Sequence, residues 1–279
     1  MAIDLHTHTT ASDGTLAPAE LVRAALEGGV EVIAVTDHDT VDGIAPAREA
    51  AAGTGLRVLA GVELSSTHEW RGLHLLAYGV DPAGATFTAR LRELAALREE
   101  RVRAMLGRLR PLGIDLSWER VVALARGTVG RPHVARALVE AGHARDSGDA
   151  FARYIGSGGP AYLPSARLTV AEAVAIARDA GGAVALAHPL LSLSRRELVA
   201  LLPALRAAGL DGLEVYHSEH DAADSRYLRA LAAERGLWWT GGSDFHGEAK
   251  PRVRLGGVAV PPDVLAQGPF PRVGGFGPG

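Results

Sequence analysis

Short apolar runs that end in histidine or carboxylate side chains recur along this chain, and they constrain the fold more than any other feature. Each run reads as a strand, and its polar groups follow at the carboxyl end. The groups are His6, His8, Asp13, His38, Glu63, His74, His188, Asp244 and His246. A fold that unites them must bring the ends of strands far apart in sequence to one rim.

The order of the expected elements predicts an α/β fold with a parallel sheet and covering helices. Strands are expected over residues 2–8, 30–36, 57–64, 73–80, 183–187, 211–216 and 237–242. An open doubly wound sheet is possible for this order. A TIM-like barrel fits better, because the carboxyl ends of all barrel strands ring one mouth.

The β-α rhythm is interrupted once. Residues 84–165 begin with a long Ala/Leu/Arg/Glu-rich helical stretch and hold no strand candidate. We therefore expect a helical insertion over the active site, between barrel segments 1–83 and 166–265. Residues 266–279, which become rich in Gly and Pro, are expected to form a flexible tail.

Composition excludes several classes of protein. The net charge of −3 does not suit nucleic-acid binding by bulk electrostatics. The absence of Cys excludes disulfides, thiolate metal sites and cysteine nucleophiles. The amino terminus lacks the features of a signal peptide, and no apolar run is long enough to span a membrane. We expect a cytoplasmic protein with no obligate protein partner.

The polar groups point to metal chemistry. His6 and His8 are two residues apart, so on a strand they share a face and can chelate one ion, whereas Leu5 is expected to face the helices. Taken singly, Glu63 could form a salt bridge and His74 could be a satisfied core histidine. Together, the six imidazoles and three carboxylates exceed what one ion uses. The set predicts a multinuclear centre and hydrolysis of a phosphorylated substrate.

With these residues in view, the chain resembles the PHP (polymerase and histidinol phosphatase) family, in particular its stand-alone nucleotide phosphoesterases. The matching motifs are Asp-Leu-His-Thr-His at 4–8, Ser-Asp-Gly-Thr at 12–15, Val-Thr-Asp-His-Asp at 35–39, Gly-Val-Glu at 61–63, His74, Ala-His-Pro at 187–189, Gly-Ser-Asp-Phe-His at 242–246 and Gly-Arg-Pro-His at 130–133. The resemblance implies a distorted (βα)7 barrel.

It also implies three divalent ions, of manganese, iron or zinc. Their ligands would be His6, His8, Glu63 and Asp244 for the first ion, Asp13, His38 and His246 for the second, and Glu63, His74 and His188 for the third. A metal-bound hydroxide held by Glu63, Asp13 and Asp244 would attack phosphorus in line with the leaving oxygen.

The expected substrate is a small nucleotide such as a nucleoside 3′,5′-bisphosphate, with 5′–3′ trimming of short single-stranded oligonucleotides as a second activity. Histidinol phosphate phosphatase is the first alternative, and a non-catalytic metal-binding accessory module is the second. Arg131 and His133 are candidates for phosphate binding, Arg131 because its guanidinium matches a phosphate. Tyr216 and His217, which end another strand, could line the pocket or pack behind it.

Overall fold

The computed structural model describes residues 1–69, 71–125, 127, 129–164 and 168–273. The chain divides into two compact units. The first comprises Met1–Arg90 and Arg167–Gly279, and the second comprises Leu91–Ala166. Within the described ranges, none of the helices combines the length and the apolar composition that crossing a bilayer requires.

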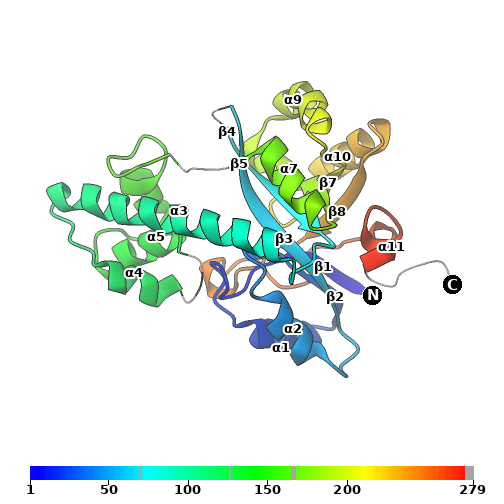
Figure 1. The fold of residues 1–279 in the computed structure, drawn as a ribbon, viewed down its shortest axis with the longest axis horizontal. Helices are drawn as coiled ribbons and strands as arrows, with labels where there is room; N and C mark the ends of the chain where they lie inside the picture. The colour runs from blue at the N-terminus through cyan, green and yellow to red at the C-terminus, as the bar shows by residue number, and fades with distance from the viewer. Residues whose placement is uncertain (70, 126, 128, 165–167, 274–279) are drawn as a thin grey trace. The chain divides into compact units, whose positions relative to one another are not determined.

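The first unit is built on one mostly parallel sheet, which confirms the predicted α/β class (Figure 1). Its strands are β1 (Ala2–Thr7), β2 (Val30–Val35), β3 (Arg57–His68), β4 (Arg71–Tyr78), β5 (Leu168–Thr169), β6 (Ala183–Leu186), β7 (Gly212–His217) and β8 (Trp238–Gly242). They lie in the order β1-β2-β3-β4-β6-β7-β8, and β5 pairs with β3.

Strand β4 departs from the predicted parallel arrangement. It pairs antiparallel with both β3 and β6. No helix separates β3 from β4, so the two strands form a hairpin rather than a parallel pair joined by a crossover. The reversal places His74, near the start of β4, at the edge where the parallel strands end.

The first and last strands of the order come together just beyond β8. Thr7 and Phe245 form a parallel bridge. The N–H of Asp244 donates to the carbonyl of His6 at 2.9 Å, and the N–H of His8 donates to the carbonyl of Phe245 at 2.9 Å. A Cβ on Gly242 would lie 2.3 Å from the backbone nitrogen of His6, so only glycine permits this approach.

Helices cover the sheet of the first unit. Figure 1 shows α1 and α2 together on one side, and α7, α9 and α10 together on another. Thr169 and Ser194 begin α7 and α9 with capping boxes. Each hydroxyl accepts the backbone N–H of the Glu three residues later, and the carboxylate of that Glu accepts the backbone N–H of the capping residue. The helical segments are α1 (Pro18–Glu27), α2 (Ile44–Ala51), α7 (Val170–Asp179), α8 (Pro189–Ser192), α9 (Arg195–Ala207), α10 (Ala222–Glu234), η3 (Gly247–Ala249), η4 (Pro262–Ala266) and α11 (Phe270–Val273).

An apolar cluster in the first unit corrects two expectations. Leu5 packs with Leu76 and Tyr78, not against outer helices, and the Tyr78 hydroxyl donates to the Leu5 carbonyl at 2.8 Å. The register between β1 and β2 shifts within Asp4–Thr7, so strict alternation fails there. Phe270 is fully buried in the same cluster, so this part of the predicted flexible tail is packed.

The second unit is helical. Helix α3 (Ala85–Leu109) runs into it from the first unit. It is followed by η1 (Arg110–Leu112), α4 (Trp118–Ala125), α5 (Arg131–Glu140), α6 (Ser147–Ala150) and η2 (Phe151–Ile155). A cluster that includes Met105, Leu138 and Ile155 forms a core of its own. The expectation that this segment covers the active site stays a prediction.

Candidate metal centre

The polar groups singled out in the sequence lie together at the edge where the parallel strands end. His6 is near the end of β1, His8 and Asp13 follow it, and His38 lies beyond β2. Glu63 and His74 stand on the paired strands β3 and β4. The remaining three, His188, Asp244 and His246, follow β6 and β8.

Glu63 is the centre of this arrangement. Its Oε2 lies 3.3 Å from His6 Nε2, 3.2 Å from His8 Nε2 and 3.1 Å from His38 Nδ1. Its Oε1 lies 2.9 Å from His74 Nδ1 and 3.0 Å from His188 Nε2. Both oxygens of one carboxylate thus face separate sets of imidazoles, as a bridge between cations requires.

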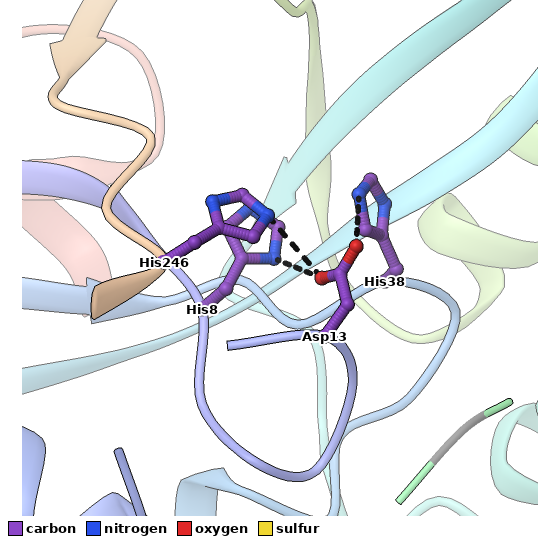
Figure 2. A group of neighbouring side chains, drawn as sticks. All are labelled: His8, Asp13, His38 and His246. Carbon is purple, nitrogen blue, oxygen red and sulfur yellow. Dashed lines mark ion pairs between the residues drawn. The ribbon is translucent and has the colours of Figure 1, made fainter. Parts of the chain in front are cut away.

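Asp13 forms a second cluster with three histidines, drawn in Figure 2. Its Oδ1 lies 3.2 Å from His246 Nε2 and 3.8 Å from His8 Nδ1, and its Oδ2 lies 3.8 Å from His38 Nε2. The rings of His8 and His246 stack at 4.0 Å between centroids. Figure 2 shows the carboxylate between His38 on one side and the stacked rings on the other.

Asp244 completes a third cluster with His6, His8 and Glu63. Its Oδ1 lies 3.2 Å from His8 Nε2 and 3.6 Å from His6 Nε2. These three atoms are buried, and none has a hydrogen-bond partner of normal geometry among the described residues. Buried polar atoms without such partners are costly unless a cation takes the place between them. The donor set therefore fits divalent ions that accept imidazole and carboxylate.

The electrostatics of the cluster favour cations. Burial alone would raise the pKa of Glu63, but His38, His74 and His6 hold that pKa well below its usual range. Burial would likewise lower the pKa of His8, yet the nearby Asp244 and Glu63 carboxylates raise it to about 9. The carboxylates stay ionised, and without an ion they retain protons on His6 and His8, whereas burial holds the pKa of His38 well below its usual value. Metal binding must displace those protons.

The backbone at two of these residues is strained. Asp244 has φ of 58° and His188 has φ of 27°, in the left-handed region that residues with a Cβ rarely adopt. Such strain persists only where the surroundings fix it, and it concentrates at functional sites. It supports a functional role for both side chains beyond their proximity.

Two acids near His38 have structural partners. Asp37 accepts the Thr9 N–H at 2.7 Å and the Ser12 hydroxyl at 2.6 Å, which anchors the loop that carries Asp13. Asp39 accepts the Ser65 N–H at 2.7 Å. Their burial after an apolar strand is therefore compensated by hydrogen bonds.

Sequence reasoning missed two residues that contact the centre. Glu214 is fully buried; its Oε1 lies 2.9 Å from His6 Nδ1, and its Oε2 accepts the His188 N–H at 2.6 Å. A charge inside the apolar strand β7 was a usable signal for it. The Lys250 ammonium contacts Asp244 Oδ2 from a loop, where no sequence pattern marks it.

The predicted phosphate-binding residues lie in the second unit. Arg131 is the first residue of α5, with its guanidinium carbon 5.5 Å from the Phe151 ring centroid. His133 is buried, and its Nδ1 accepts the Gly130 N–H at 3.0 Å. Their part in substrate binding stays a prediction. His217, whose role the sequence left open, lies with Nε2 3.4 Å from Asp244 Oδ2.

Comparisons with known proteins agree with this geometry. The sequence profile of the PHP domain matches residues 4–154. The chain is 38% identical over 244 residues to a 5′-3′ exoribonuclease of Haemophilus influenzae, covering 87% of this chain and 89% of that protein. It is 34% identical over 247 residues to a 3′,5′-nucleoside bisphosphate phosphatase of Chromobacterium violaceum, covering 88% of this chain and 87% of that protein.

A solved structure from Bifidobacterium adolescentis, provisionally described as a metal-dependent phosphoesterase, has a similar fold. Its TM-score is 0.85 at 35% identity, with 95% of this chain and 94% of that one covered. Similarity thus extends over both sequence and fold, across nearly the full length of each chain.

Proposed function

The chain belongs to the PHP domain family, and on that premise we propose that it is a metal-dependent phosphoesterase acting on nucleotides. The observation that carries the proposal is Glu63, whose two carboxylate oxygens each face imidazoles from different strands. Its relatives are named as a nucleoside bisphosphate phosphatase and a 5′-3′ exoribonuclease, both of which act on phosphate esters of nucleotides.

Three divalent ions of manganese, iron or zinc are proposed as the cofactors. The cluster of His6, His8, Glu63 and Asp244 would hold one ion, and that of Asp13, His38 and His246, with His8 alongside, a second. Glu63 with His74 and His188 would hold a third, since both imidazoles face its Oε1. When bound, such ions supply Lewis acidity to a phosphate ester and stabilise the charge that develops on it.

The chain's own residues prepare the site for this chemistry. The carboxylate of Glu214 contacts Nδ1 of His6. Because this contact fixes the orientation of the ring, Nε2 of His6 is directed toward Glu63. Lys250 and His217 contact the outer oxygen of Asp244 and orient its other oxygen toward the cluster. Burial of Glu214 and His217 excludes water around them and strengthens their electrostatic interactions.

Two finer features belong to the same proposal. We propose that the sheet closes as a distorted (βα)7 barrel, which the bridge between Thr7 and Phe245 supports.

We also propose that Arg131 and His133 bind substrate phosphate. Replacing Arg131 with Ala should raise KM about tenfold, as loss of a charged hydrogen bond does, and leave metal content unchanged. Loss of metal in that variant would instead make Arg131 structural.

The test is an assay of the manganese-loaded protein on a nucleoside 3′,5′-bisphosphate, a 5′-phosphorylated short RNA and histidinol phosphate. Release of phosphate or nucleotide from either of the first two is expected, and Glu63→Gln should abolish both. Hydrolysis of histidinol phosphate alone would overturn the nucleotide assignment. Stoichiometric metal without turnover of any ester would indicate the accessory-module alternative, which the family membership and the assembled donor set do not favour.

A further inference from the structure

A separate cavity of about 400 Å³ opens beside the metal centre in the first unit. One wall is the carboxyl end of β7 and the start of α10, from Tyr216 to Ser225. The other is the segment after β8 that carries Arg252 and Arg254. Strands β7 and β8 are parallel, so the cavity lies at the same end of the sheet as Asp244. Its volume is within the range of small-molecule sites.

His217 connects the cavity to the metal centre. It is among the residues that line the cavity, and its Nε2 lies 3.4 Å from Asp244 Oδ2. A ligand group in the cavity would therefore lie one side chain away from a carboxylate of the centre. A substrate whose reacting ester is at the centre could extend into it.

Arginines outnumber carboxylates in the lining of the cavity. Arg252 and Arg254 form no ion pair with any carboxylate in the described part of the chain, whereas Arg195 and Arg229 nearby are paired with Asp224 and Asp263. The one carboxylate in the lining, Asp221, caps α10 by accepting the N–H groups of Ala223 and Asp224, each at 2.7 Å. Its Oδ1 is therefore engaged with the helix backbone, and the lining keeps one more arginine than carboxylate.

We propose that this cavity binds a second phosphate group of the substrate, with Arg252 and Arg254 as its ligands. Guanidinium groups match phosphate oxygens in charge and geometry. The apolar lining from Val258 and Ala259 suits an adjoining ribose or base. The inference rests on the proposed function, because a nucleoside bisphosphate and an oligonucleotide both carry a second phosphate beyond the one attacked.

The test is the variant carrying Arg252→Gln and Arg254→Gln, with Arg226→Gln, an exposed arginine outside the cavity, as matched control. The substrates are adenosine 3′,5′-bisphosphate, a 5′-phosphorylated RNA trinucleotide and p-nitrophenyl phosphate, which has a single phosphate. We expect kcat/KM to fall about tenfold per arginine for substrates with two or more phosphates, from loss of charged hydrogen bonds, and far less for p-nitrophenyl phosphate.

The outcomes separate the possible sources of the phosphate. A loss confined to the bisphosphate assigns the cavity to the phosphate of a mononucleotide, and a loss confined to the trinucleotide assigns it to the next phosphodiester. Equal losses on all three compounds, or no loss, would overturn the proposal, as would an equal effect of Arg226→Gln.

A binding measurement keeps this inference distinct from the proposed function. Calorimetry of adenosine 3′,5′-bisphosphate with the chelator-treated protein needs no turnover. Weaker binding by the double variant than by the wild type and by Arg226→Gln would support the cavity even if no ester were hydrolysed. Identical binding by all three proteins would refute it even if the wild type proved an active phosphoesterase.

Discussion

Glu214 contacts two groups from different strand ends, the His6 ring and the His188 backbone. Replacing it with Gln keeps its volume but removes the charge that orients His6. Loss of such an outer contact of a metal-binding histidine typically weakens metal binding about 10- to 100-fold. We therefore expect metal affinity to fall by about this factor. Titration of the metal-free protein with manganese measures the change. Glu49→Gln, at an exposed position, serves as control, and equal affinity of both variants would contradict the prediction.

The raised pKa of His8 predicts how metal uptake depends on pH. In the metal-free protein Asp244 and Glu63 raise it to about 9, so the imidazole is protonated below that value and neutral above it. A metal binds only the neutral imidazole, so affinity should increase as pH rises toward about 9, with release of protons. Calorimetry near pH 7 in buffers of different ionisation enthalpy tests this. A binding enthalpy that is independent of the buffer would count against it.

The role of a single residue can be predicted when its position relative to apolar strands is visible in the sequence. His38 and Glu63 end apolar strands, and Glu214 interrupts one, so burial of a charge could be read directly. Lys250 lies in a loop, and only folding brings it to Asp244. The strand-end pattern also does not distinguish Asp37, which is satisfied by hydrogen bonds, from Glu63.

Among the elements, the approach of β8 to β1 depends on a single glycine. A Cβ at position 242 would lie 2.3 Å from the backbone nitrogen of His6, so Gly242→Ala must push the two strands apart. We expect a loss of about 1–3 kcal/mol in the free energy of unfolding, as for other overpacked sites, with weaker metal binding because His6 and Asp244 separate. Urea unfolding and metal titration measure the two effects.

A glycine without close neighbours provides the control for that substitution. A Cβ on Gly107 would meet nothing within 4 Å, and Gly107 lies in helix α3. Gly107→Ala should leave stability equal or slightly increased, because Ala is the better helix former. If Gly242→Ala were as well tolerated as Gly107→Ala, β1 and β8 could not be packed as closely as described.

The type of most elements is predictable from the sequence, whereas their direction and register are less so. Periodicity and capping residues such as Thr169 locate helices well. The direction of β4 follows only from the short connection to β3. The residues of β4 themselves would fit a parallel or an antiparallel strand equally well. The irregular register in β1 arises from pairing with β2, which no local pattern reveals.

For the whole molecule, two separate cores determine what loss of metal can do. The first unit buries Glu63 and Asp244 of the centre and leaves Asp13 half-buried, and the second has an apolar core that includes Met105 and Leu138. A break in β-α alternation makes the helical segment visible in the sequence. The packing of Phe270 is not visible there, because a short apolar group in a Gly/Pro-rich tail resembles a flexible end.

Metal removal should therefore destabilise the molecule locally. A ligand that binds only the folded state adds stability in proportion to the logarithm of its concentration over Kd, about 2.7 kcal/mol at a hundredfold excess over Kd. Chelation should increase hydrogen exchange around Glu63, Asp13 and Asp244, where the ions that join side chains from different strands are lost. Amides of α4 and α5, which pack on the other core, should keep their protection. Mass spectrometry of hydrogen exchange, with and without chelator, measures the exchange of both groups of amides. Equal loss of protection in both units would show that the two cores unfold together and would contradict the prediction.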